Sequence, residues 1–145
     1  MDLESAIQIS ASGLKANRVW INVLSSNLAN VNTTKTAEGV PYTRKTVIYE
    51  ATPSEGFAGE LSAAMGGGAE KVQVSDIVPD KRDFRQVYDP SHPDADEKGI
   101  VLMPNINPVE EMANLVNASR SYEANLAALQ TARQLALKSM EIGAK

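Results

Sequence analysis

The chain has 145 residues, a formal net charge of −4 and no cysteine, and only 5% of its residues are aromatic. The missing cysteine excludes disulfides, thiolate chemistry and cysteine-based zinc sites, and the net negative charge argues against a nucleic-acid partner. No segment approaches the ~18 consecutive apolar residues of a transmembrane helix, so we expect no membrane span.

A long helix is predicted over residues 3–31, where apolar side chains return every seven residues. Such a stripe favours packing against a second helix or against neighbouring subunits. Gly13 lies inside this helix, where it either permits close approach of another backbone or is a tolerated flaw. The heptad repeat is formed by Ile7, Leu14, Ile21 and Leu28, with Leu3, Leu24 and Val31 at the complementary position.

Asparagine is unusually dense toward the end of this helix. Two interpretations stay open. The side-chain amides could bond across packed helices and fix their register, or they could mark a frayed, solvated helix end. The residues concerned are Asn17, Asn22, Asn27, Asn30 and Asn32.

The middle of the chain changes to a period of two and contains all seven prolines, from Pro41 to Pro108. Alternating and β-branched residues predict four short strands that form one small β module. A glycine-rich segment, residues 55–68, is expected to be a flexible loop or an insert ordered only on contact. The predicted strands cover residues 42–49, 71–74, 84–88 and 99–103.

The only histidine lies in an acidic, proline-containing turn at residues 89–97. A calcium loop starting at Asp94 would place Lys98 where an oxygen ligand belongs and Asn105 where a bidentate glutamate belongs, so a turn held by Asx hydrogen bonds is the better interpretation. We identify no nucleophile–base pair, phosphate-binding loop or nucleophile elbow, and expect neither enzymatic activity nor a cofactor. The turn motif consists of Asp89, Pro90, His92, Pro93 and Asp96.

A second long helix is predicted over residues 108–142, with Asn107 as N-cap and Pro108 at the first helical position. About 34 residues give a helix of ~51 Å, which is far longer than usual, so its apolar stripe needs partners. The stripe contains Met112, Leu115, Ser119, Tyr122, Leu126, Leu129, Ala136 and Met140.

Several blocks resemble the bacterial flagellar basal-body rod protein family. Residues 25–34, with the sequence SSNLANVNTT, match the signature near the amino terminus of rod and hook proteins. Three further blocks look like the C-type proximal rod subunits within that family. They are residues 88–96, residues 99–105, and residues 109–112 with 118–125. The signature residues carried over are Asn27, Leu28, Ala29, Asn30 and Thr33.

The resemblance implies a structural subunit that stacks helically into the hollow driveshaft of the basal body. Its terminal helices would line and stiffen the tube around the export channel. Its partners would be further copies of itself, other rod proteins and the base or export-gate components. It would be exported to the periplasmic rod by the flagellar type III apparatus without a cleaved signal, which agrees with an acidic amino terminus that lacks a basic n-region.

The predicted fold class is α+β, with two long terminal helices packed as a coiled-coil-like antiparallel pair and a small β-rich module inserted between them. The predicted parts are residues 1–34, 35–107 and 108–145. Two alternatives remain at this point: another flagellar axial subunit of the rod or hook, and a small calcium-binding module.

Overall fold

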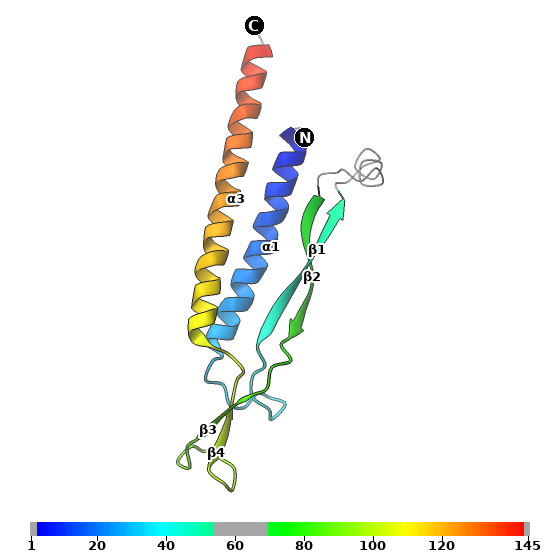
Figure 1. The fold of residues 1–145 in the computed structure, drawn as a ribbon. Coiled ribbons are helices and arrows are strands. Elements are labelled where there is room, and N and C mark those ends of the chain that lie inside the picture. Colours follow the sequence, from blue (N-terminus) through cyan, green and yellow to red (C-terminus); the bar gives the residue numbers. More distant parts are fainter. Residues whose placement is uncertain (1–2, 54–69, 144–145) are drawn as a thin grey trace.

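The computed structural model describes residues 3–53 and 70–143. Three elongated elements lie side by side in it (Figure 1). The helix α1, Leu3–Ala29, lies between the helix α3, Pro108–Gly143, and a hairpin of β1, Lys45–Pro53, and β2, Glu70–Pro79. A second, shorter hairpin of β3, Arg85–Tyr88, and β4, Ile100–Met103, extends beyond the lower end of the helices. The α+β architecture with two long terminal helices is confirmed.

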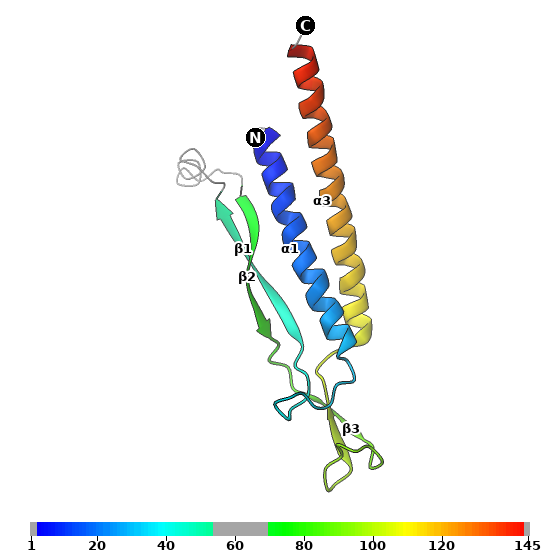
Figure 2. The ribbon, with the colours of Figure 1, turned by 180° about the vertical axis from the view of Figure 1, so that it is seen from behind.

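The two helices run antiparallel along most of α1 (Figures 1 and 2). Their contact buries Ala118 and Ala132 of α3, and only α1 covers that helix among the described elements. The larger Leu115, Tyr122 and Leu129 of α3 are partly buried. A β-carbon at Gly13 would lie 2.8 Å from the Nδ2 atom of Asn125. Gly13 therefore permits close approach of the two backbones, the first of the two interpretations.

The helix α3 continues past the start of α1 (Figure 2). Because Gly13 faces Asn125 in an antiparallel pair, Leu3 lies near the level of residue 135. The last two turns of α3 therefore have no partner from α1, and they carry exposed Leu135, Leu137, Met140 and Ile142.

The first hairpin pairs Lys45 with Pro79 at one end and Pro53 with Glu70 at the other, with an irregularity between Ile48 and Tyr49. It packs on the side of α1 that faces away from α3 (Figures 1 and 2). The rings of Trp20 and Tyr49 meet edge to face at 6.4 Å between centroids. Such aromatic pairs add about 0.5–1.5 kcal/mol to the area they bury.

The predicted strands of this hairpin were wrong in their bounds. The prediction of 42–49 starts too early, because the backbone N–H of Arg44 binds the side chain of Asn105 instead of a strand. The prediction of 71–74 is too short, since the ladder continues through polar Ser75 and Asp76 with a register shift that leaves Ser75 without a Cα partner. The predicted glycine-rich segment, residues 55–68, lies outside the described residues.

The second hairpin agrees with its prediction to within one residue at each strand. Arg85 pairs with Met103 and Tyr88 with Ile100. Gly99 allows the return of the chain, because its φ is +76° and a β-carbon there would crowd Tyr88 and Pro90 at 3.0 and 3.1 Å. Among the described helices and strands, β3 and β4 contact only each other. The predicted single β module is therefore two separate two-stranded sheets.

The close approach at Gly13 predicts that Gly13→Leu overpacks the helix contact and lowers the free energy of unfolding by about 1–3 kcal/mol. Removing the opposing amide with Asn125→Ala should recover part of that loss. Urea titrations followed by circular dichroism measure both effects, with Ala128→Leu on the exposed side of α3 as a matched control. Equal loss with and without Asn125→Ala would show that the clash lies elsewhere.

Candidate functional site

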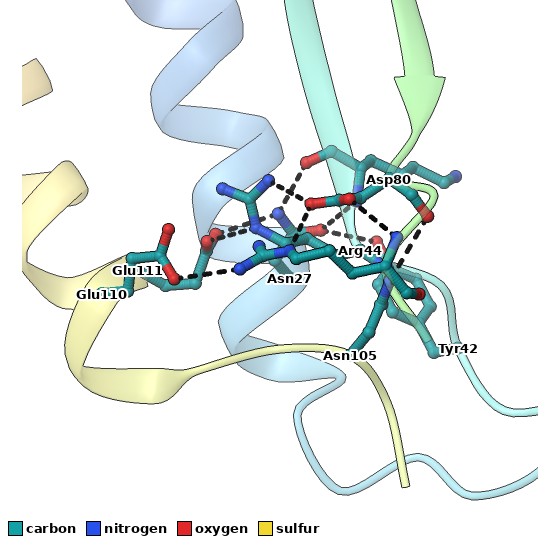
Figure 3. Close-up of polar contacts among 9 residues, drawn as sticks. Asn27, Tyr42, Arg44, Asp80, Asn105, Glu110 and Glu111 are labelled. Atoms are coloured by element: carbon teal, nitrogen blue, oxygen red, sulfur yellow. Dashed lines mark hydrogen bonds and ion pairs between the residues drawn. The ribbon is translucent and has the colours of Figure 1, made fainter. Parts of the chain in front are cut away.

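A cluster of polar side chains joins the lower end of the helix pair to both hairpins (Figure 3). We call it the polar junction. Each member lies within a few residues of the end of a helix or strand, so the cluster gathers the ends of all the described elements. It consists of Asn27, Tyr42, Arg44, Lys45, Asp80, Arg82, Asn105, Glu110 and Glu111.

Asn27, near the end of α1, is the central amide of the polar junction and is 0% exposed. Its Nδ2 atom donates to the Lys45 carbonyl at 2.8 Å and to Glu111 Oε2 at 2.9 Å. Its Oδ1 atom accepts from the Lys45 backbone N–H at 2.9 Å and from the Tyr42 hydroxyl at 3.2 Å. One side chain therefore fixes the start of β1 against both helices.

Glu111 is the buried acid of the polar junction, with 1% of its surface exposed. Its Oε1 atom accepts from Arg44 Nε at 2.7 Å, and its Oε2 atom accepts from Asn27. Glu111 lies in the first turns of α3, where the helix dipole favours negative charge. The Asn107 side chain caps that helix by accepting from the Val109 N–H at 3.1 Å, as predicted.

Arg44 connects this buried acid to the second hairpin. Its Nη1 atom lies 3.0 Å from Asp80 Oδ2, and its backbone N–H donates to Asn105 Oδ1 at 2.8 Å. Asn105 is buried and donates in turn to the carbonyls of Arg82 and Asp80. An outer ion pair between Arg82 and Glu110, 3.3 Å apart and half exposed, closes the network on the solvent side.

Asp80 is ionised in this setting. Partial burial raises the pKa of its carboxyl group, but the hydrogen bonds and charge of Arg82 and the hydrogen bond of Arg44 outweigh that effect, so the pKa of Asp80 lies below its usual value. Within residues 3–53 and 70–143, every buried side-chain nitrogen or oxygen atom has a hydrogen-bond partner. The polar junction is therefore complete within one chain.

The residues predicted to form the apolar stripes divide into two groups. Leu24 is buried, and Ile7, Leu14, Ile21, Leu28, Leu115, Tyr122 and Leu129 are partly buried. Met112, Leu126 and Met140 are exposed instead, by 53%, 37% and 71%. The face of α3 toward α1 is rotated from the predicted stripe, because small Ala118 and Ala132 and the bonded Glu111 occupy the contact.

Two family models match this chain. The model described as "Flagella basal body rod protein" covers residues 7–35, and "Flagellar basal body rod FlgEFG protein C-terminal" covers residues 97–142. A flagellar basal-body rod protein FlgC of Bacillus subtilis is 43% identical over 95% of this chain and 96% of its own length. FlgC proteins of Aquifex aeolicus and Borreliella burgdorferi are 38% and 36% identical over 97% and 98% of both chains.

The chain belongs to the flagellar basal-body rod protein family. The resemblance drawn from the sequence is thereby confirmed, and the two matched segments cover most of the two long helices together with the turn that follows α1 and the segment that precedes α3. Neither helix of this rod protein, within the residues described, is long and apolar enough to cross a membrane.

The rod-protein signature ends α1 and turns the chain away from it. Asn30 donates from Nδ2 to the Ser26 carbonyl at 2.8 Å, and the Thr33 hydroxyl donates to Asn30 Oδ1 at 3.2 Å. The dense asparagines thus have different roles. Asn27 bonds across packed elements, whereas Asn30 forms the helix end and Asn22 and Asn32 are exposed. Of the other signature residues, Leu28 is partly buried and Ala29 is exposed.

The turn motif has the Asx hydrogen bonds expected of it. Asp89 Oδ1 accepts from the backbone N–H and the hydroxyl of Ser91, and Asp96 Oδ1 accepts from the N–H groups of Lys98 and Ile100. The hydrogen bonds from Ser91 lower the pKa of Asp89. The turn also contacts the signature, because the Thr34 hydroxyl donates to Asp94 Oδ2 at 2.7 Å.

His92 accepts a hydrogen bond from the Asp94 N–H at Nδ1, and Pro90 and Pro93 flank it. No group of three or more histidine, cysteine, aspartate or glutamate side chains among the described residues is placed to hold a metal ion. The carboxylates of Asp89 and Asp96 bond to the backbone of the turn itself, which is a structural use of those groups.

The sequence reasoning missed Arg44, Asp80, Asn105 and Glu111 as site residues. Glu111 falls only within the matched block 109–112, and Arg44 only within the predicted strand 42–49. The available signal was Asn27 within the signature, because a polar residue on an apolar helix face needs polar partners when it is buried.

The geometry at Asn27 predicts a large effect of Asn27→Ala. Removing the amide of Asn27 leaves the backbone N–H and carbonyl of Lys45 without these hydrogen bonds, and it leaves Glu111 with one partner fewer. Since each buried group left unsatisfied costs ~1–3 kcal/mol, the free energy of unfolding should fall by roughly 3 kcal/mol or more. Urea unfolding measures it, and Asn22→Ala, on the exposed side of the same helix, should change stability by less than about 0.5 kcal/mol.

The lowered pKa of Asp80 predicts an acid-sensitive contribution to stability. A carboxyl group with a lower pKa in the folded chain stabilises above its unfolded pKa of about 3.9, and that contribution is lost as pH falls through the folded value. Asp80→Asn should therefore destabilise at pH 7, and the difference from the wild-type chain should shrink below about pH 4. Urea midpoints between pH 3 and 7 test this; parallel curves for the two chains would contradict it.

Proposed function

We propose that this chain is a structural subunit of the proximal rod, the driveshaft of the bacterial flagellar basal body. It polymerises through its terminal helices, transmits torque and encloses the export channel. The observation that carries the proposal is the full-length similarity to proteins named flagellar basal-body rod protein FlgC. The family is structural, and its name describes a part of the flagellum rather than a reaction.

Exposed apolar side chains on α3 support assembly through this helix. Val109, Met112 and Val116 are each at least half exposed, and their spacing of three and four residues places them on one face. Burying a side chain of this size contributes ~1.5–3 kcal/mol. A few such side chains, buried between subunits, hold each copy firmly in a polymer. In a lone chain the same side chains stay exposed to water.

The polar junction supports the transmission of torque. A driveshaft subunit must pass a twisting load between its helices and the rest of its structure without bending at the connection. Buried and partly buried hydrogen bonds between five chain segments make that connection stiff, because any rotation of one segment breaks several bonds at once.

The partners of the subunit follow from the same proposal. They are further copies of this chain, other rod proteins and the base or export-gate components below the rod. The subunit reaches the periplasmic part of the basal body by type III export without a cleaved signal peptide.

Loss of the gene should abolish the rod while leaving the membrane ring in place, and Leu126→Asp should reproduce this loss. Leu126 is partly exposed on α3, so an aspartate there leaves the isolated fold intact but cannot be buried between subunits. Electron microscopy of basal bodies and swimming assays measure the outcome.

Gln130→Asp, at an exposed polar position one turn further along α3, is the matched control and should swim normally. Circular dichroism of the purified variants checks that both keep their helices. Normal rods built from Leu126→Asp chains would exclude this face of α3 from assembly.

A further inference from the structure

Glu111 is an unusual residue for the contact between two helices. It lies at the contact of α3 with α1, yet it is charged and 1% exposed. Neither of its partners belongs to α3, because Asn27 comes from α1 and Arg44 from the segment that leads into β1. Its burial therefore depends on two other parts of the chain being in place.

The register of the helix pair brings these groups together in only one arrangement. Gly13 faces Asn125 and Asn27 faces Glu111, and both pairs fit the same antiparallel alignment, since residue numbers rise by fourteen in one helix and fall by fourteen in the other. Sliding α3 by one turn in one direction would place Glu111 level with buried, apolar Val23, and in the other direction level with Val31, beyond the end of α1.

The small residues of the contact do not forbid such a slide. A slide of α3 by one turn, combined with a small rotation, would bring exposed Ser121, which is smaller than Asn125, opposite Gly13. Ala118 and Ala132 fit many partners for the same reason. Partly buried Leu115, Tyr122 and Leu129 contribute to the register, and the polar side chain adds a penalty to every other register.

We propose that Glu111 is a register lock for the helix pair. An ionised carboxylate that is buried without partners is strongly unfavourable, so α3 can close on α1 only where Asn27 and Arg44 receive it. The helix pair can then form only when the segment between the helices, residues 35–107, is folded. In that segment Asp80 and Asn105 hold Arg44 in place, the latter through the backbone N–H of Arg44. Pairing with the helix of another copy, where Arg44 is not positioned, is disfavoured in the same way.

Distances between spin labels test the lock, and the absence of native cysteine allows clean labelling. Arg18→Cys on α1 and Gln134→Cys on α3 place labels at exposed positions well separated along the helix axes. A slide of one turn changes their separation along the axis by ~5.4 Å. The purified full chain is sufficient, diluted with unlabelled protein, so the result does not depend on incorporation into a rod.

The chain with the native polar junction should give one narrow distance. Arg44→Met should remove that distance from most molecules, because Glu111 then lacks its cation. In Arg44→Met/Glu111→Leu the helices should pair again, but with a second population displaced by one turn. The matched control is Arg82→Met/Glu110→Leu, which removes the half-exposed ion pair between the same parts of the chain and should keep the single distance.

Three results would overturn the proposal. The first is a native distance distribution in Arg44→Met alone. The second is a single, unchanged register in Arg44→Met/Glu111→Leu, which would mean that the apolar contact selects the register by itself. The third is the absence of a defined distance in the native chain, because the lock would then fail to close the helix pair.

Discussion

The arrangement of the chain depends on the hydrogen bonds of the buried Glu111 carboxylate. They join it to the side-chain amide of Asn27 in α1 and to the guanidinium of Arg44, just before β1. The two helices contact each other through small and larger apolar side chains, and the first hairpin covers only the other side of α1. Neither contact fixes where the lower ends meet. The polar junction does so, because its hydrogen bonds have directions as well as distances. Its position at the ends of the elements lets one cluster orient all of them.

Local signals in the sequence were sufficient for the elements with strong periodicity or clear ends. The helix predicted over 108–142 agrees with Pro108–Gly143, because Asn107 and Pro108 define its start. The helix predicted over 3–31 ends two residues earlier, at Ala29, where the signature turns the chain. The strands β3 and β4 were also found, since short apolar runs between turn residues are local features.

Contacts between residues far apart in the sequence could not be predicted from such local signals. Arg44 and Glu111 are 67 residues apart, and nothing near either one indicates the other. The predicted stripe of α3 is only partly correct: Leu115, Tyr122 and Leu129 are partly buried, whereas Met112 and Met140 are exposed. Alanine and a paired acid occupy the rest of the contact with α1. The pairing of the strands into two separate hairpins also depends on long-range geometry. The assembly roles of the exposed stripe residues stay a prediction.

The unequal length of the two helices gives the subunit two mechanical regimes. Along most of α1, two helices and a hairpin lie side by side and resist bending together (Figure 1). From about residue 135 onward α3 is a single helix, roughly 36 Å from Glu111 at 1.5 Å per residue. A single helix bends far more easily than a bundle of three elements. This end can therefore change its angle to fit differently placed neighbours. Because the polar junction lies at the opposite end of the helix, such bending does not disturb its hydrogen bonds.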